Sequence, residues 1–381
     1  MAEVSLQSKI DLLTEEQIMI QDSAASFMEQ DSELGRVREC RFSQPGYQKS
    51  VWKEIADLGW LGLTIPENYG GMGMGFSELV LLVEQMGKGL LPEPYVATVV
   101  LAGGAILNGD NETAKKELLG KLVEGDWIPA LAWQEGRASM TTEAAAVTAS
   151  GSGDQVTLSG QKVFVPGAGG ADSFVVSAKT SGGTALYLVS SDAQGVSLDY
   201  AQRVDGGYYA TLTLDNAKAE SCIASAAIGQ GVLDKVIDEA RVATSAELLG
   251  VMTRALEISV DYISQRVQFG KPIGSFQALQ HKSVDLFILS EISRSVVIQT
   301  ATTFDDESSS EKDLAAITSR VKARCSDAAL QITKDSIQLH GGIGYTDECN
   351  IGLYLKKAML LSSWLGNATY HRKRYADLVV I

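Results

Sequence analysis

Cysteine and histidine are scarce in this sequence. Its 381 residues include four cysteines, at positions 40, 222, 325 and 349, and three histidines. No two cysteines have C-x-x-C spacing, and so few candidate ligands argue against a zinc site or a metal cluster. We therefore expect no metal centre, and we interpret the cysteines as reduced thiols of a cytoplasmic protein.

Basic residues and long apolar runs are scarce too. The chain has 32 Lys and Arg against 47 Asp and Glu, which gives a formal net charge of −15. Such a charge argues against binding to nucleic acid or to an anionic lipid surface. The longest apolar stretch, 95–107, is shorter than the roughly 20 residues of a membrane span. The N-terminus also does not have the pattern of a signal peptide. We expect neither a nucleic-acid partner nor a membrane partner.

The composition is nevertheless that of a chain with a core, at 45% hydrophobic and 21% charged residues. Its pattern changes twice. Residues 1–125 predict helices joined by Gly and Pro turns, and Thr14 and Gln17 have the spacing of a capping box. Residues 126–225 contain short segments rich in Val, Thr and aromatics, separated by Gly, Ser or Asp. These segments are typical of a small antiparallel barrel or sandwich.

Residues 226–381 return to a helical period. Long helices are expected at about 276–302, 311–340 and 350–376, and their short connections favour a bundle. The order of helices, strands and helices predicts an α+β fold with three domains, at 1–125, 126–225 and 226–381. The sequence has no G-x-G-x-x-G motif between a strand and a helix, so a Rossmann fold is disfavoured.

Two segments carry residue types that suit a nucleotide. In the run 266–270, an Arg at the end of a helix can bind a diphosphate through its forked guanidinium, and Phe269 can stack on a ring. From the residues alone, however, we favour the alternative that Arg266 caps helix carbonyls and Phe269 packs in the core. In the run 338–345, the glycines let the backbone approach a ligand closely, but a tight turn between two helices explains them equally.

Together, these segments resemble the acyl-CoA dehydrogenase family. RVQFGKPIGSFQALQH is similar to the family's Arg-x-x-Phe-Gly segment, and QLHGGIGY is similar to its Gln-x-x-Gly-Gly segment. IPENYGGMGMG and SGQKVFVPGA resemble two further segments of the family, so the resemblance covers nearly the whole chain. It implies an N-terminal all-α domain, a small antiparallel β domain and a C-terminal four-helix bundle.

The resemblance also implies FAD as the cofactor and an acyl-CoA thioester as the substrate. In the family, a carboxylate removes the α-proton, a β-hydride passes to the flavin, and electrons leave to an electron-transfer flavoprotein. The residues implied to hold the diphosphate and adenosine of a neighbouring subunit's FAD are Arg266, Gln268, Phe269, Gln338, Gly341 and Gly342. The residues implied to contact the flavin half are Trp133, Gln134, Phe164, Pro166, Gly366 and Asn367.

The sequence departs from the family at the position of the usual base. Many members have a C-terminal Tyr-Glu-Gly-Thr segment, and the matching residues here are Trp-Leu-Gly-Asn at 364–367. Leu365 stands in place of the glutamate and cannot accept a proton. Phe164 and Pro166 likewise replace a Trp and a Thr that face the flavin.

Glu247 is the best substitute for the missing base. Some members place their base near Ala240, and Glu247 lies two turns further along the same helix face. The AELLG segment resembles the branch of the family that acts on steroid side chains and other bulky CoA esters, in which the matching Glu is the presumed base. The residues one turn away, Ala243, Thr244, Gly250 and Val251, are small enough for a ring or an acyl chain to approach. Composition alone would favour a solvated helix glutamate.

Two other carboxylates are weaker candidates. Glu348 lies in the turn after the glycine pair. Glu239 is one residue from the alternative base position, which rotates it by about 100° around the helix. We interpret His281, His340 and His371 as structural residues because no Ser or Cys nucleophile lies near them in the sequence.

Three functions therefore remain open. The first is an FAD-dependent acyl-CoA dehydrogenase that uses Glu247 and converts a bulky or steroid-derived acyl-CoA to the 2-enoyl-CoA. The second is a flavin enzyme of the same fold without dehydrogenation, such as a desulfinase-like lyase. The third is a non-catalytic subunit of a hetero-oligomeric dehydrogenase. Since Glu247, Arg266 and Gln338 are all on one chain, we favour a self-sufficient homotetramer, a dimer of dimers. The sequence does not identify the acyl group.

Overall fold

The computed structural model describes residues 13–30, 34–137 and 139–379. The predicted capping box is confirmed: the Thr14 hydroxyl accepts a hydrogen bond from the Gln17 N–H at 3.2 Å, and Gln17 Oε1 accepts one from the Thr14 N–H at 3.1 Å. It begins helix α2 (Glu15–Glu29). The helical elements that follow are α3 (Gly35–Cys40), α4 (Lys49–Asp57), η1 (Trp60–Gly62), η2 (Glu67–Tyr69), α5 (Phe76–Lys88), the π-helix η3 (Val96–Gly103), α6 (Gly104–Leu107) and α7 (Glu112–Val123).

The middle of the described chain forms one sheet of eight strands. They are β1 (Pro129–Ala132), β2 (Thr148–Ser150), β3 (Thr157–Pro166), β4 (Ser173–Thr180), β5 (Gly183–Ser190), β6 (Val196–Gln202), β7 (Tyr208–Lys218) and β8 (Ser221–Ala224), with the turns η4 (Gly153–Gln155) and η5 (Ala168–Gly170). The order across the sheet is β6-β7-β3-β2-β4-β5-β8, with β1 beside β4. Most pairs are antiparallel, as predicted, but β4 pairs in parallel with β1 and β2.

Two strands that the sequence predicts as separate are one strand. The segments QVTLSG (155–160) and KVFVPG (162–167) are two of the short strands predicted within 126–225, the first ending in a glycine, but β3 runs through parts of both. Gly160 has a φ of 136° and lies at a shift in the register between β3 and β7. Glycine can adopt this conformation as a bulge, so the strand bends there and continues instead of ending.

The C-terminal part of the chain is helical. Its elements are α8 (Gly229–Gln265), the hairpin β9 (Val267–Gln268) and β10 (Lys271–Pro272), η6 (Ile273–Ser275), α9 (Gln277–Phe304), α10 (Glu311–His340), η7 (Gly341–Tyr345), α11 (Ile351–Ser363) and α12 (Ala368–Val379). The single helix predicted at 350–376 is wrong, because α11 and α12 are separated by a turn. Leu365 and Gly366 have φ values of 59° and 105° there. Their carbonyl oxygens accept hydrogen bonds from the side chains of Arg241 and Lys322.

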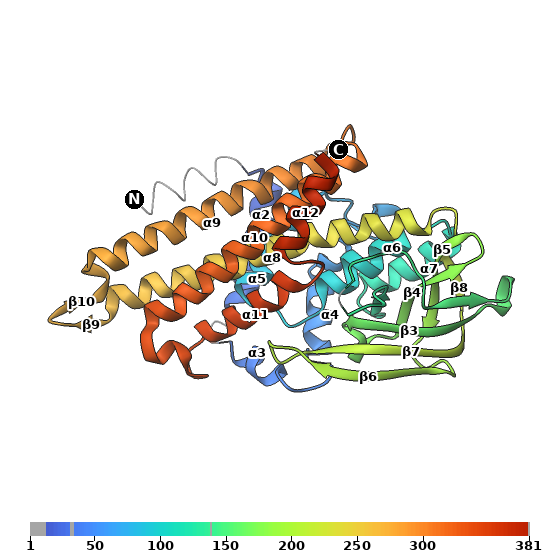
Figure 1. Cartoon of the computed structure of the whole chain (residues 1–381), viewed down its shortest axis with the longest axis horizontal. Helices are drawn as coiled ribbons and strands as arrows, with labels where there is room; N and C mark the ends of the chain where they lie inside the picture. The colour runs from blue at the N-terminus through green and yellow to red at the C-terminus, as the bar shows by residue number, and fades with distance from the viewer. Residues whose placement is uncertain (1–12, 31–33, 138, 380–381) are drawn as a thin grey trace.

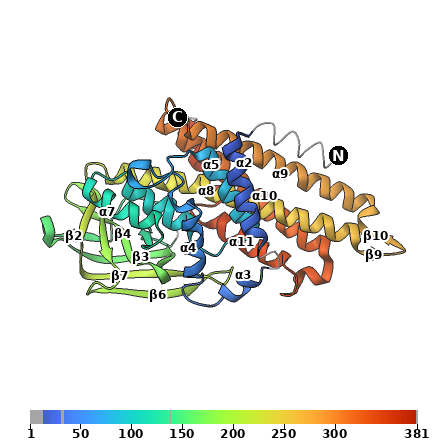
Figure 2. The same ribbon diagram turned by 180° about the vertical axis from the view of Figure 1, so that it is seen from behind.

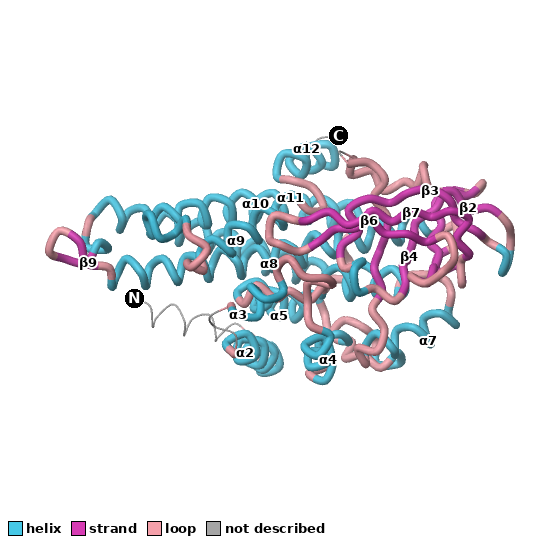
Figure 3. Tube along the Cα trace, turned by 90° about the horizontal axis from the view of Figure 1, so that it is seen from below, coloured by secondary structure: helices cyan, strands magenta, loops and turns pink. Residues whose placement is uncertain are grey.

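The bundle and the sheet lie at opposite ends of the molecule. The long helices α8, α9 and α10 form one end, with the β9–β10 hairpin at its tip, and the sheet forms the other (Figure 1). Seen from behind, α2 and α5 cover the bundle (Figure 2). The view from below shows the same separation (Figure 3). Both helical parts share one buried apolar cluster, and a second cluster lies within the sheet. Within the described ranges, no helix combines the length and the apolar character needed to span a membrane.

Helices α5 and α8 cross at very close range. A Cβ added to Gly250 would overlap the carbonyl oxygen of Glu84, and one added to Gly87 would overlap the carbonyl oxygen of Glu247. The crossing is therefore possible only because glycine occupies one position on each helix. A buried ion pair reinforces it, since Arg294 Nη1 of α9 lies 2.7 and 2.8 Å from the two carboxylate oxygens of Glu84. These contacts fix the backbone on which Glu247 stands.

Gly250→Ala should destabilise the protein by about 1–3 kcal/mol or more, because the new methyl group overpacks the crossing. The measurement is the midpoint of thermal or denaturant unfolding. Gly231→Ala is the matched control on the same helix, since a Cβ there meets nothing within 4 Å. It should be neutral or stabilise by up to about 1 kcal/mol through helix propensity. Equal midpoints for the two variants would contradict the role of the crossing.

Candidate active site

Glu247 lies in the buried middle of α8. Its residue is only 8% exposed, so the solvated alternative is wrong. Its Oε1 atom lies 2.6 Å from the ammonium nitrogen of Lys357 on α11. The small residues around Glu247 do leave it buried, as expected, but the carboxylate has a cationic partner that the sequence pattern did not reveal.

Glu247 lines a cavity between the sheet and the helices. The sheet side contributes Pro166 from the end of β3 and Tyr209 from β7. The helical side contributes Tyr95, which precedes η3, and the α11 segment with Lys357 and Trp364. Because the walls come from all three parts of the chain, the cavity exists only in the complete fold.

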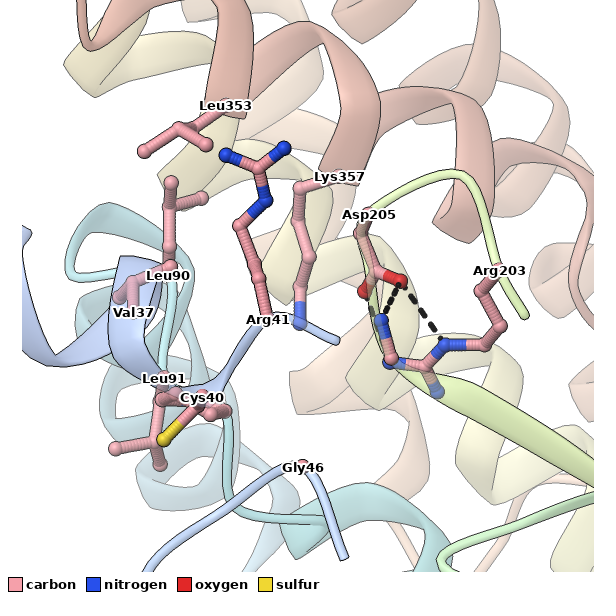
Figure 4. A pocket seen from close by; sticks show the side chains of 12 residues that line it. Val37, Cys40, Arg41, Gly46, Leu90, Leu91, Arg203, Asp205, Leu353 and Lys357 are labelled. Atoms are coloured by element: carbon pink, nitrogen blue, oxygen red, sulfur yellow. Dashed lines mark hydrogen bonds and ion pairs between the residues drawn. The ribbon is translucent and has the colours of Figure 1, made fainter. Parts of the chain in front are cut away.

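A second cavity continues from the first. The two share Gly46, Pro92, Arg203, Gly207 and Lys357. Beyond these residues the wall is largely aliphatic, formed by Val37, Leu90, Leu91 and Leu353 (Figure 4). A ligand that reaches past Glu247 therefore meets charged groups first and an apolar wall after them.

The charged groups at the junction of the two cavities come from the turn between β6 and β7. Arg203 binds Asp205 through two hydrogen bonds, Nε to Oδ1 at 3.0 Å and Nη2 to Oδ2 at 2.8 Å. Burial would raise the pKa of Asp205, but the charges of Arg203 and Lys357 lower it. Figure 4 shows Lys357 extending from its helix beside this pair. With Glu247, these residues form a cluster of two cations and two anions.

The turn at 364–367 carries no base. Leu365 is buried, and its carbonyl oxygen accepts hydrogen bonds from Arg241 Nε at 3.0 Å and from His371 Nε2 at 3.0 Å. Burial, together with the nearby cations, lowers the pKa of His371 to about 2, so the ring is neutral. Lys322 donates to the carbonyl oxygens of Leu361 and Gly366. The turn is thus held by buried donors instead of supplying a carboxylate.

Trp133 and Gln134, two of the predicted flavin contacts, are buried in the segment that follows β1. Lys162 donates to the carbonyl oxygen of Trp133 at 3.2 Å and to Glu135 at 2.7 Å, which fixes the segment after β1. Burial would raise the pKa of Glu135, but Lys162 and two backbone N–H groups lower it to about 2. Gln134 donates to the carbonyl oxygens of Gly136 and Ser139.

Of the remaining predicted flavin contacts, Pro166 is the one that lines the cavity. Phe164 has a φ of 53° and meets Tyr209 edge to face at 5.7 Å. Gly366 is buried in the turn between α11 and α12, and Asn367 is exposed, with its Oδ1 accepting the Tyr370 N–H at the start of α12.

The second predicted group lies at the other end of the molecule. Arg266 and Gln268 are exposed beside the β9–β10 hairpin, and Phe269 is 89% exposed, so the core alternative for Phe269 is wrong. Gln338 is exposed near the end of α10, and the Gly341–Gly342 turn follows it. Tyr262 stacks on His340 at 4.4 Å, which joins the ends of α8 and α10. The two predicted segments therefore follow the ends of two helices that contact each other.

The two groups of predicted cofactor residues are far apart in one chain. The hairpin and the sheet occupy opposite ends of the long axis (Figure 1). The far end fits the diphosphate and adenosine half of FAD, since Arg266 is a cation and a Cβ at Gly341 or Gly342 would meet nothing within 4 Å. The cavity end fits a flavin ring by its apolar wall. Within the described chain, the two groups therefore form two separate regions.

Sequence reasoning missed Lys357, Arg203 and Asp205. Lys357 follows Lys356 within the apolar run of α11, and only its packing shows which of the two lysines turns inward. Lys356 instead reaches Asp347 at 3.4 Å. The run Arg-Val-Asp-Gly-Gly at 203–207 has the composition of an ordinary turn, so no local signal marks it.

Comparison with known proteins agrees with this architecture. Two family models match, "Acyl-CoA dehydrogenase, N-terminal domain" over residues 14–126 and "Acyl-CoA dehydrogenase, C-terminal domain" over residues 206–379. The mitochondrial isovaleryl-CoA dehydrogenase of Pongo abelii is 28% identical over 379 residues, which are 95% of this chain and 88% of that protein.

Two solved structures show the same fold over nearly the whole chain. The structure of the Tcur3481-Tcur3483 steroid ACAD is 31% identical, with a TM-score of 0.87, and the match covers 96% of this chain and 98% of that one. Butyryl-CoA dehydrogenase from Megasphaera elsdenii is 25% identical, with a TM-score of 0.87 and coverages of 97% and 99%.

The fold and the cavity are those of a flavin-dependent oxidoreductase. The chain belongs to the acyl-CoA dehydrogenase family. Members of this family bind FAD and act on CH–CH groups, so the expected class of enzyme and its cofactor are confirmed. The predicted order of a helical domain, an antiparallel sheet and a helical bundle is confirmed as well.

The rival carboxylates do not line the cavity. Glu348 is exposed in the turn after η7. Glu239 is nearly buried against α6, where a Cβ added to Gly104 would lie 3.5 Å from its Oε2. Its closest cation is Lys235, at 4.0 Å. Burial outweighs this distant charge and raises the pKa of Glu239 to about 7.

Glu239→Gln should stabilise the protein at pH 8 and have little effect at pH 4.5. The folded state binds a proton at Glu239 that the unfolded state releases above its ordinary pKa, so wild-type stability falls as the pH rises from 4.5 through 7. A neutral amide avoids this cost, which amounts to at most about 3 kcal/mol. Melting temperatures at the two pH values test it, with Glu257→Gln on the same helix as an exposed control. A gain of equal size at both pH values would contradict the prediction.

Proposed function

We propose that Glu247 is the catalytic base of an acyl-CoA dehydrogenase. The observation that carries the proposal is its position: of the three carboxylates proposed from the sequence, Glu247 is the one that lines the cavity between the sheet and α11. Glu93 also lines this cavity, but its Oε1 is paired with Arg36 Nη1 at 2.7 Å. Glu93 is therefore the rival that an experiment must separate.

The reaction follows from the cavity. The α carbon of an acyl-CoA thioester would lie beside Glu247, whose carboxylate takes the α-proton. FAD, when bound, supplies the acceptor for the hydride that leaves the β carbon. The product is the 2-enoyl-CoA. Pro166 and Tyr209 supply an apolar wall opposite Glu247, which excludes water from the site of proton transfer.

The cofactor residues divide between two chains in this proposal. Trp133, Gln134, Phe164, Pro166, Gly366 and Asn367 hold the flavin half. Arg266, Gln268, Phe269, Gln338, Gly341 and Gly342 of a second chain hold the diphosphate and adenosine half. The exposure of Phe269 supports this arrangement, because an apolar ring that is 89% exposed gains from being covered.

A second copy of the chain is the partner we propose. Helix α9 exposes an apolar stripe in which Val284, Phe287, Ile288, Ile292 and Ile298 are each 47–55% exposed. A stripe of this length on the outside of a bundle suits packing against another bundle, and it supports the expected homotetramer. A hetero-oligomer remains the alternative, since the similar steroid ACAD is named for two proteins.

We propose a bulky, steroid-like acyl group as the substrate. The continuation of the cavity past Lys357 to an aliphatic wall supports it, and so does the likeness to a structure described as a steroid ACAD. An electron-transfer flavoprotein is the proposed acceptor, and the cytoplasm is the proposed compartment. The four cysteines are free thiols, which agrees with a reducing compartment.

Glu247→Gln should retain FAD and lose at least ~100-fold in the rate of flavin reduction, because the amide cannot accept the α-proton. The measurement is anaerobic bleaching of the flavin absorption by CoA thioesters, from butyryl to a steroid side-chain ester. Glu348→Gln is the control and should behave as wild type. Loss of activity in Glu93→Gln with activity kept in Glu247→Gln would move the base to Glu93. A wild-type flavin that no ester reduces would favour the lyase or subunit function.

Mixing two inactive variants should restore activity. Arg266→Ala with Phe269→Ala removes FAD contacts at one end of the chain, whereas Glu247→Gln removes the base at the other. A mixed dimer then has one site with both ends intact. Random pairing gives at most about a quarter of the wild-type rate, since half of the dimers are mixed and each has one intact site of two. Mixed dimers that form, as shown by native mass spectrometry, and stay inactive would exclude a shared cofactor site.

A further inference from the structure

The contact between Glu247 and Lys357 does more than neutralise a buried charge. The two atoms are 2.6 Å apart, and their side chains are only 10% and 14% exposed. Lys357 also lines both cavities, so its ammonium group faces the space where a ligand enters. An ion pair that served packing alone would have no need to face a cavity.

The other cations near Glu247 are engaged elsewhere. On α8, Arg241 binds Asp238 at 2.7 Å and Arg254 binds Glu257 at 3.1 Å. Arg294 of α9 binds Glu84 of α5. These pairs leave Lys357 as the contacting partner of Glu247 among the ion pairs of the described chain.

Further titratable groups line the two adjoining cavities, of which the second contains Glu247 and both contain Lys357. Arg203 and Asp205 come from the β6–β7 turn and Arg41 from the segment after α3, where Arg41 lies 3.0 Å from Asp347. Glu93 and the phenols of Tyr47, Tyr95, Tyr208 and Tyr209 complete the set. Burial raises the pKa of Tyr209 to about 12, so it carries no charge near neutral pH.

The residues of the β6–β7 turn influence which carboxylate Lys357 contacts. Lys357 lies close enough to Asp205 to help lower its pKa. Asp205, however, is already bound by two hydrogen bonds from Arg203 and one from the Gly207 N–H at 3.1 Å. Arg203 is therefore the hydrogen-bonding partner of Asp205, and Lys357 is the cation in contact with Glu247, while the charge of Glu247 also helps raise the pKa of Arg203.

We propose that Lys357 is a positioning residue that keeps the Glu247 carboxylate ionised and fixes the direction in which it accepts the α-proton. This inference rests on the proposed function of Glu247. An opposite charge in contact favours the charged form of a carboxylate, and a nearby like charge disfavours it. Without Lys357, the buried Glu247 carboxylate would lose the one cation that contacts it among the ion pairs of the described chain.

The proton balance agrees with a positioning role. In the forward step, the α C–H bond breaks and an O–H bond forms on Glu247; the electron pair left on the α carbon forms the Cα=Cβ bond as the β C–H bond breaks, and its hydride would go to FAD, when bound, as the acceptor. Lys357 keeps its three protons throughout. It neither accepts nor supplies a proton, so its effect is on the ionisation and orientation of Glu247.

Lys357→Met should move the acid limb of the rate of flavin reduction to higher pH by ~1–3 units, the range that an opposite charge in contact produces. The measurement is anaerobic stopped-flow reduction by one CoA ester across the pH range. Lys357→Arg should restore much of the wild-type profile because it keeps the charge. Lys356→Met, which removes the neighbouring surface ammonium, should leave the profile unchanged.

A second variant tests the same cluster with the opposite sign. Asp205→Asn removes an anion near Glu247, so its acid limb should move to lower pH. If Lys357→Met fails to fold or to bind FAD, the pH profile of Asp205→Asn alone tests the proposal. Profiles of Lys357→Met and Asp205→Asn that fall equally at all pH values, without a shift, would overturn the proposal. An inactive Glu247→Gln with an unshifted Lys357→Met profile would refute this inference alone, and an active Glu247→Gln would refute the proposed base.

Discussion

The close crossing of α5 and α8 is the constraint on which the rest of the site depends. Gly87 and Gly250 allow the two backbones to touch, and the carbonyl oxygen of Glu247 lies at the contact. Because one backbone atom of Glu247 is pressed against another helix, its side chain has a fixed origin. Protein interiors are close-packed and transmit small displacements. The contact between α5 and α8 therefore also affects the distance between Glu247 and α11.

Charge neutrality is the second condition that the site meets. Two cations and two anions from α8, α11 and the β6–β7 turn meet at the junction of the cavities. Removing one member from such a cluster leaves a buried charge without compensation, which costs more than the pair contributes. In the neighbouring turn at 364–367, backbone carbonyl oxygens instead of carboxylates are the partners of the buried cations. Lys322 and Arg241 bind oxygens there, and burial lowers the pKa of Lys322 to about 7.

Local sequence patterns predicted the fold. The features that these patterns missed depend on tertiary packing. The capping box at Thr14, the end of α8 at Arg266 and the glycine turn after Gln338 are readable because neighbouring residues in the sequence make the contacts. Lys357 was not predictable, because it meets Glu247 only after α11 folds back on α8, 110 positions earlier in the numbering. The break between α11 and α12 was missed for the same reason: Arg241 binds Leu365 across 124 residues.

The separation of the two ends of the chain has a consequence for assembly. The cavity lined by Glu247, the proposed base, lies between the sheet and the helices, whereas the β9–β10 hairpin with Phe269 lies at the tip of the bundle. If the cofactor site is shared as proposed, a partner chain needs only the hairpin end of its bundle to complete the FAD site of this chain. It needs no base of its own. A homotetramer satisfies this condition with every site alike. A related chain that had lost its base but kept the tip would satisfy it too, and would leave half of the sites catalytic. If Glu247 is the base, as proposed, the same arrangement would serve a homo-oligomer and a hetero-oligomer, and the chain that carries Glu247 would perform the proton transfer.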